Sequence, residues 1–177
     1  MAGNAVGAVI FTGAGREPAG HHIVEPRFDF LGAALDRAGA PFHADIGAAH
    51  AGWRGALDGI LEATLAAMEA LGADRGDTVA VIGPTISQRA YEVGPEFFDN
   101  FVSDDPENTR FFANGDGDRM LFDLPGYGLN RLRRAGVGQA EWIRHCTYSD
   151  DNRFYSYRRS THAKEADYGR LLSAIRL

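Results

Sequence analysis

Residues 46–72 have the sequence IGAAHAGWRGALDGILEATLAAMEALG, and this stretch carries the strongest fold signal in the chain. Its first four residues form a short apolar run, which is typical of the end of a buried strand. HAGWRG (residues 50–55) follows, and its two glycines flank a turn. From Leu57 onward apolar residues recur at helical spacing, and Gly72 is a suitable stop for that helix. The stretch therefore predicts a strand that leads directly into an amphipathic helix.

Apolar runs and turn residues on both sides of this stretch predict a mixture of helices and strands. Further strands are expected at residues 5–12, 78–82, 120–124, 140–146, 154–158 and 171–177. Further helices are expected at residues 28–38, around 97–101 after Pro95, and at 127–135. Residues 13–20 and 38–45 are expected to be connections. This order favours strands with both parallel and antiparallel neighbours.

Composition limits the class of protein. The chain has 177 residues, of which 45% are hydrophobic, which suits one compact domain with a real core. The net charge of -6 gives no reason to expect nucleic acid or an anionic membrane as a partner. The single cysteine excludes an intrachain disulfide, and we find no apolar run that could span a bilayer and no secretory signal. A cytoplasmic protein is therefore expected.

The HAGWRG segment is the first candidate site, because it lies where a strand leads into a helix. Its glycines allow close backbone approach, and the free N–H groups of a helix start favour an anion. Arg54 adds a planar cation that suits phosphate. His50, at the strand end, is placed to act as a metal ligand or a general base. A tight structural turn, with Trp53 in the core and Arg54 at the surface, explains the same residues.

Tyr91 and Glu92 form a second candidate, because they follow a strand that Gly83 and Pro84 bring to an end. Their side chains could hydrogen-bond a ligand. A structural loop that leads into the next helix is the alternative interpretation.

A third candidate lies near the C-terminus, where Arg158 and Arg159 could hold phosphate or simply solvate an edge strand. The lone Cys146 is interpreted as packing, because a single buried cysteine is usually inert. The arginines at the end of the helix over residues 127–135 are expected to complement the helix dipole.

Taken together and in order, these segments resemble the bacterial laccase-domain family, whose members are often named polyphenol oxidase or purine nucleoside phosphorylase. The resemblance covers residues 46–177, whereas residues 1–45 are atypical and shorter than the family's opening part. It implies an α+β fold of one domain with an α/β/β/α layered sandwich and mixed sheets. The segments that carry it are HAGWRG, IGPTISQRAYEVG, FDLPGYGLNRLRRAGV, HCTYSDDNRFYSYRR and GRLLSAIRL.

The resemblance also implies chemistry on purine nucleosides with phosphate as the second substrate. Members similar to this chain cleave adenosine, inosine and S-methyl-5′-thioadenosine by phosphorolysis and deaminate adenosine. By this resemblance His50 and Arg54 are the candidate catalytic residues, and Tyr91, Glu92 and Arg158 are the candidate substrate-binding residues.

The family site holds zinc through a histidine in Gln-Val-His, a cysteine in Thr-Ala-Asp-Cys and the histidine of HAGWRG. Only the last has a counterpart here, which is His50, and the other two segments are absent from the sequence. A catalytic zinc normally has three protein ligands. Two alternatives therefore stand beside the enzyme: a non-catalytic binding or interaction module of the same fold, and a homo-oligomer in which a second subunit completes the site.

Copper-dependent phenol oxidation is disfavoured by the residues themselves. A multicopper centre needs many imidazoles, commonly in His-x-His pairs, together with cysteine. The chain has six histidines, no His-x-His pair and one cysteine.

Overall fold

The computed structural model describes residues 8–15, 43–70, 73–167, 169 and 171. The helix predicted over residues 28–38 lies outside this part of the chain, as does the strand predicted beyond Leu171.

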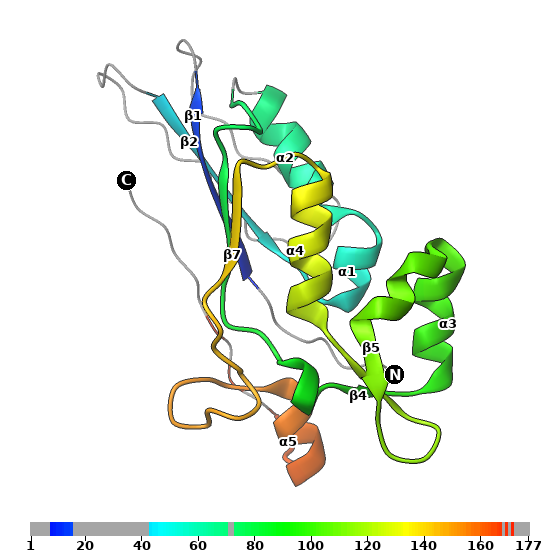
Figure 1. The fold of residues 1–177 in the computed structure, drawn as a ribbon. Coiled ribbons are helices and arrows are strands. Elements are labelled where there is room, and N and C mark those ends of the chain that lie inside the picture. The colour runs from blue at the N-terminus through cyan, green and yellow to red at the C-terminus, as the bar shows by residue number, and fades with distance from the viewer. Residues whose placement is uncertain (1–7, 16–42, 71–72, 168, 170, 172–177) are drawn as a thin grey trace.

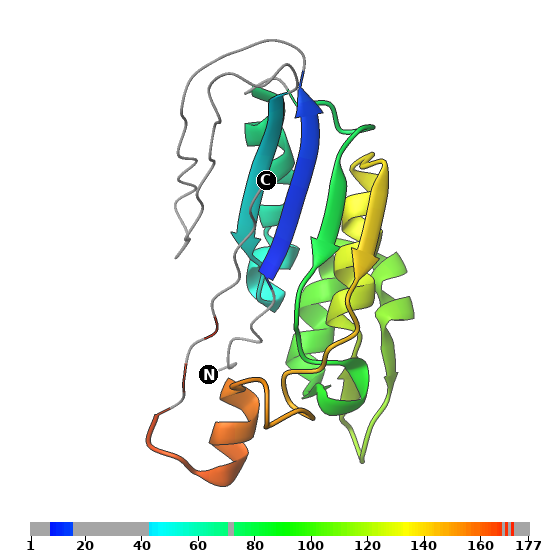
Figure 2. The same ribbon diagram turned by 90° about the vertical axis from the view of Figure 1, so that its left-hand side faces the viewer.

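A four-stranded sheet forms the centre of the molecule, with the strand order β2-β1-β3-β7 (Figures 1 and 2). Strand β1 pairs antiparallel with β2 and β3, whereas β3 and β7 are parallel. The predicted α+β class with mixed sheets is confirmed. Strands β1, β2, β3 and β7 span Ala8–Gly15, His43–His50, Val79–Ile82 and Gln139–Trp142.

Two helices occupy the region where one helix from Leu57 was predicted. Helix α1 (Trp53–Leu57) already begins after Gly52, and α2 (Ile60–Ala70) follows it. The prediction of a turn between the two glycines of HAGWRG was therefore wrong, because the second glycine lies inside α1. The break between the helices occurs at Gly59, whose φ of 90° is in the left-handed region that favours glycine.

Helices α2 and α4 (Leu124–Arg134) lie side by side on one face of the central sheet (Figure 1). Gly128 on α4 permits this close packing, because a Cβ there would lie 3.0 Å from Cδ1 of Ile82 in the sheet. Leu61 of α2 and Leu132 of α4 are completely buried in the same layer. No helix in the described part of the chain has both the length and the apolar character needed to cross a membrane.

A second, smaller sheet has the order β4-β6-β5 and is antiparallel throughout. It consists of β4 (Glu92–Val93), β5 (Phe112–Asn114) and β6 (Met120–Phe122). Helix α3 (Pro95–Asp104) is the predicted helix after Pro95, and the short helices η1 (Gln88–Ala90) and η2 (Pro106–Phe111) flank it in the chain. An aromatic core joins α3, α4 and this sheet, and it contains Phe97, Phe101, Phe122 and Tyr127.

Several predicted boundaries were wrong. Strand β1 continues to Gly15 and β2 begins at His43, so both predicted connections there are partly extended strand. Strand β7 ends at Trp142 instead of continuing to Cys146, because Arg144 has a φ of 59° that no regular strand contains. The chain then pairs again through a single parallel bridge between Thr85 and Cys146.

The strand predicted at residues 154–158 was also wrong, because α5 (Tyr157–Ala163) begins there. Ser156 is the N-cap, and its hydroxyl accepts a hydrogen bond from the backbone N–H of Arg159 at 3.3 Å. This cap fixes a helix where the alternation of aromatic and polar residues had indicated a strand.

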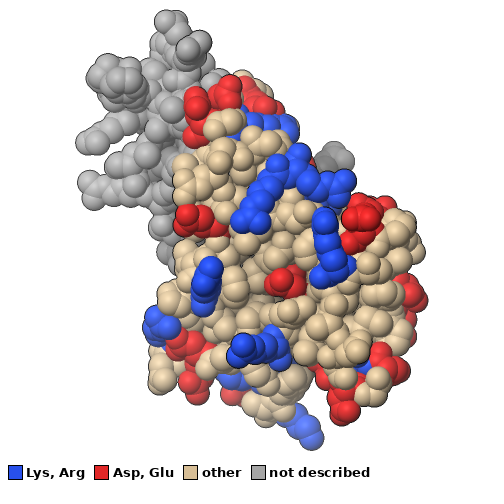
Figure 3. Space-filling view, viewed as in Figure 1, with Lys and Arg blue, Asp and Glu red and all other residues tan. Residues whose placement is uncertain are grey.

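Basic side chains gather over the C-terminal end of α4, on the face that Figure 3 shows. Arg131 does more than complement the helix dipole, because its Nε lies 2.5 Å from Oε1 of Glu62 on α2. It also donates to the Tyr127 hydroxyl at 2.7 Å. Arg134 pairs with Asp105 after α3 at 3.1 Å. These arginines connect α4 to α2 and to the residue that follows α3.

Candidate functional site

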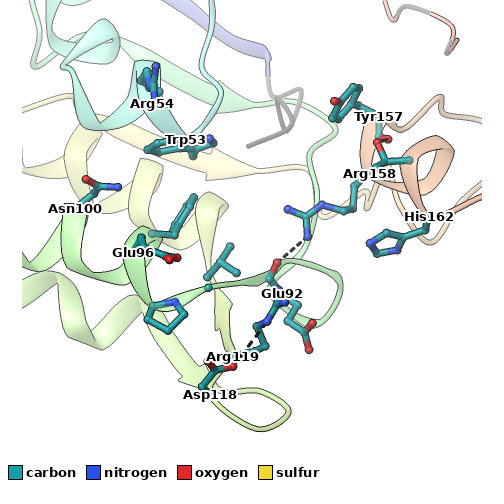
Figure 4. A pocket seen from close by; sticks show the side chains of 15 residues that line it. Trp53, Arg54, Glu92, Glu96, Asn100, Asp118, Arg119, Tyr157, Arg158 and His162 are labelled. Atoms are coloured by element: carbon teal, nitrogen blue, oxygen red, sulfur yellow. Dashed lines mark hydrogen bonds and ion pairs between the residues drawn. The ribbon is translucent and has the colours of Figure 1, made fainter. Parts of the chain in front are cut away.

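A cleft of about 740 Å³ opens between α1, the start of α3, the turn before β6, and α5 (Figure 4). This volume lies within the range of small-molecule sites, which is roughly 300–1,000 Å³. Trp53 and Phe97 form part of its apolar wall, with ring centroids 4.8 Å apart. Its charged or titratable side chains include Arg54, Glu92, Glu96, Arg119, Arg158 and His162.

Arg158 has a fixed position at the edge of this cleft. Its Nη1 donates a hydrogen bond of 2.6 Å to the backbone carbonyl of Glu92, which joins α5 to β4. The guanidinium also lies over the Tyr91 ring, 5.1 Å from the centroid, in a cation–π contact. A cation held in this way loses little side-chain entropy when it binds an anion.

Tyr91 lies behind the cleft and does not line it. Only 1% of its surface is exposed, and its ring contacts Phe97 and Phe122. Burial raises the pKa of its hydroxyl above the usual range, and the charge of Arg158 opposes this effect only in part. Tyr91 therefore supports Arg158, whereas Glu92 is one of the residues that line the cleft.

Arg54 reaches the cleft from α1, where its guanidinium lies 5.1 Å from the centroid of the Trp53 ring. Trp53 itself is in the core and is 6% exposed. Helix α1 has only five residues, so its dipole is small. The arginine side chains are thus the main attraction for an anion here.

His50 lies apart from the residues that line the cleft. Ala49 is buried, and a Cβ at Gly47 would lie 2.6 Å from Sδ of Met68 on α2, so both face the helices. Successive strand residues alternate in direction, which directs His50 to the other face of the sheet. Its position pairs with Ala8 of β1, and it does not line the cleft. The structure therefore brings together Arg54, Glu92 and Arg158 but not His50.

His162 lines the cleft but was not among the residues predicted from the sequence. It lies on α5, and its Nδ1 is 3.0 Å from the Tyr148 hydroxyl. Arg158 and His162 are four residues apart, which places them on one face of a helix. This spacing is visible in the sequence, but a predicted strand at residues 154–158 concealed it.

Cys146 lies outside the cleft, in the segment that follows β7. Its sulfur accepts hydrogen bonds from the Ser87 hydroxyl at 3.1 Å and from the Ser149 hydroxyl at 3.4 Å. Burial raises the pKa of the thiol, but the hydrogen bonds outweigh burial and lower the pKa to about 7. The thiol of Cys146 is thus more acidic than expected for the inert, buried cysteine that the sequence predicted.

The residues do not supply a complete zinc site within the described part of the chain. There, no three His, Cys, Asp or Glu side chains are close enough to hold one metal ion. Zinc in proteins usually has four ligands, of which at least three are protein side chains. His50 offers one imidazole, and we derive no chemical step through zinc.

Comparison with known proteins identifies the family. The sequence profile of the multi-copper polyphenol oxidoreductase laccase family matches residues 40–177. The chain belongs to this family.

Within the family, the chain is similar to proteins named purine nucleoside phosphorylase. One from Rickettsia conorii is 38% identical over 131 residues, which are 73% of this chain and 54% of that protein. One from Pseudomonas aeruginosa is 40% identical over 117 residues, 66% of this chain and 47% of that protein. The chain thus spans about half the length of the relatives it matches.

Solved structures agree with the fold. Neisseria meningitidis protein NMB0706 superposes with a TM-score of 0.64 at 32% identity, over 89% of this chain and 52% of that protein. YlmD from Geobacillus stearothermophilus gives a TM-score of 0.61 at 22% identity, over 89% of this chain and 50% of that protein, and supports the fold alone.

Proposed function

We propose that this chain acts on a purine nucleoside with phosphate, as its relatives named purine nucleoside phosphorylase do, and that the cleft beside α5 binds these substrates. The observation that carries this proposal is that Arg54, Arg119 and Arg158 line different sides of one cleft with an aromatic wall (Figure 4). Phosphate needs cationic donors, and a purine needs a flat apolar surface.

Each cleft residue receives a role from its position. Arg158 would bind phosphate, because its guanidinium is already oriented by the Glu92 carbonyl and the Tyr91 ring. Arg54 would add a second cation from the opposite wall. The carboxylate of Glu92 would accept hydrogen bonds from the ribose hydroxyls, since an ionised carboxylate is an acceptor only.

In phosphorolysis, a phosphate oxygen forms a bond to the anomeric carbon while the bond from that carbon to the purine nitrogen breaks. The electron pair of the broken bond stays on the purine. Positioning by the arginines would bring the phosphate oxygen to the anomeric carbon and so lower the entropic part of the barrier. Inosine, adenosine and S-methyl-5′-thioadenosine are the proposed substrates, and deamination of adenosine is a further proposed activity.

The test is release of hypoxanthine from inosine by the purified chain, measured by chromatography with and without phosphate and with zinc added. Arg158→Gln is expected to lower kcat/KM by about 100-fold, as removal of one well-placed charged donor typically does. Arg133→Gln is the matched control, because Arg133 is an exposed arginine outside the cleft. Absence of phosphate-dependent release by the wild-type chain would refute the proposed function.

Zinc binding is a separate proposal, in which His50 is one ligand. The other donors would have to come from outside the described residues or from a second chain that completes the site. Elemental analysis of the purified protein and its solution mass distinguish these cases. A strictly monomeric mass would exclude a site shared between two copies.

The release assay together with a measurement of inosine binding distinguishes the proposed enzyme from a non-catalytic binding module. Saturable binding of inosine without any product would support the module. We propose nucleoside chemistry and not copper-dependent phenol oxidation, because the chain has no His-x-His pair and one cysteine.

A further inference from the structure

We propose that His162, oriented by Tyr148, is the acid that protonates the departing purine at N7, an inference that rests on the proposed function. Arg158 and His162 both line the cleft and both lie on α5 (Figure 4). They are one helical turn apart, and one turn rises about 5.4 Å. A nucleoside whose phosphate partner binds Arg158 would therefore lie beside the imidazole of His162 in the same cleft.

The contact with Tyr148 determines which nitrogen of His162 meets the substrate. The Tyr148 hydroxyl lies 3.0 Å from Nδ1, and the two rings meet edge to face with centroids 5.7 Å apart. Nδ1 is thus occupied, and Nε2 is the nitrogen available to a ligand. In the imidazolium form, Nδ1–H donates to the tyrosine oxygen and Nε2–H can be given to the purine.

The segment that carries Tyr148 is itself fixed. Arg159 donates to the carbonyl of Tyr148 at 2.9 Å and to the carbonyl of Thr147 at 2.7 Å. The Tyr148 side chain packs partly against the hydrophobic core. His162 therefore has an oriented partner, which is the arrangement that acid catalysis requires.

The other cleft side chains are poorer acids. Arg54, Arg119 and Arg158 do not release protons at accessible pH. The carboxylates that line the cleft, Glu92, Glu96 and Asp118, accept protons when ionised and do not donate them. Imidazole is the side chain that exchanges protons most readily near neutrality.

The protons and electrons of the step balance. The bond between the anomeric carbon and N9 breaks, its electron pair stays on the purine, and the phosphate oxygen bonds to the carbon. The imidazolium of His162 gives its Nε2 proton to N7 and becomes neutral, with the remaining proton on Nδ1 facing Tyr148. Hydrogen phosphate loses its own proton when it becomes the sugar phosphate, and this proton restores the imidazolium.

The experiment measures how fast the full chain cleaves inosine and 7-methylinosine. 7-Methylinosine carries a methyl group on N7 and a positive charge, so its purine leaves without needing a proton. His162→Asn leaves a polar atom near the position of Nδ1 and removes Nε2. This variant is expected to lower kcat for inosine by roughly 100-fold or more, the usual contribution of general acid catalysis, and to change kcat for 7-methylinosine less than about threefold.

Tyr148→Phe tests the positioning role. It is expected to slow inosine cleavage while leaving 7-methylinosine cleavage unchanged, a difference that a general loss of structure would not produce. Equal slowing of both nucleosides by His162→Asn, or no slowing of either, would overturn the inference while the proposed function stands. Failure of the wild-type chain to cleave either nucleoside would refute the proposed function and this inference together.

Discussion

Arg159 is expected to be the most important single side chain for holding the segment after β7 against α5. Its guanidinium donates three hydrogen bonds, to the carbonyls of Thr147 at 2.7 Å, Tyr148 at 2.9 Å and Phe154 at 2.5 Å. A hydrogen bond to a charged group contributes about 1.5–3 kcal/mol when it is well shielded. Arg159 is half-buried and water replaces part of each bond, so we take about 1 kcal/mol for each. Arg159→Met should then destabilise the chain by about 3 kcal/mol.

Urea unfolding followed by circular dichroism measures this effect. With a denaturant slope of about 2 kcal/mol per molar, the midpoint of Arg159→Met should fall by about 1.5 M. Arg133→Met is the matched control, because Arg133 is exposed and makes one long bond, of 3.4 Å, to the Ala140 carbonyl. Equal midpoints for Arg159→Met and Arg133→Met would show that the three hydrogen bonds of Arg159 do not stabilise the fold.

Three further outcomes are expected. Glu62→Gln and Arg131→Met should each cost about 2 kcal/mol in urea unfolding, and a double-mutant cycle should show coupling, because the pair is partly buried at 2.5 Å. Cys146 has a pKa of about 7, so iodoacetamide should modify it readily at pH 7, and Ser87→Ala should slow this reaction by raising the pKa. If His50 is a zinc ligand, His50→Ala should reduce the zinc content measured by elemental analysis, and unchanged zinc would exclude that role.

The lowered pKa of Cys146 also predicts a pH dependence of stability. The folded chain favours the thiolate more than the unfolded chain does, because an unfolded cysteine has a pKa of about 8.5. The stabilisation is therefore fully present above about pH 8.5 and is lost as the pH falls through 7. The urea midpoint of the wild-type chain should therefore contain a contribution from Cys146 that is larger at pH 9 than at pH 6. Cys146→Ser should remove this contribution. If the change in midpoint between the two pH values is the same in the variant, another group causes it.

Helices and strands with a clear hydrophobic period were predictable from the sequence. The strand at residues 78–82, the helix after Pro95 and the helix ended by Gly136 follow local rules, and they are β3, α3 and α4. α5 was not predictable in this way, because FYSYRR alternates like a strand. Its helical start depends on the Ser156 cap and on bonds from Arg159 to a distant loop.

The candidate site was predictable only in part. Arg54, Glu92 and Arg158 were singled out from three separate motifs, and the structure places all three around one cleft. His162 was missed because the strand predicted at residues 154–158 concealed its helical spacing from Arg158, and Arg119 was missed because only the tertiary arrangement brings the turn before β6 to the cleft. Proximity of this kind leaves no local pattern in the sequence.

Fluorescence titration of Trp142→Phe tests whether inosine and phosphate bind in the cleft. The chain has two tryptophans, so this variant leaves Trp53, in the cleft wall, as the only one. Inosine added with phosphate is expected to change the Trp53 emission in a saturable way below about 1 mM, the upper end of usual KM values. The double variant that carries both Trp142→Phe and Arg158→Gln should need a far higher inosine concentration to reach half of the same change in emission. No change in emission up to about 5 mM inosine with phosphate present, beyond the usual range of KM values, would contradict the account.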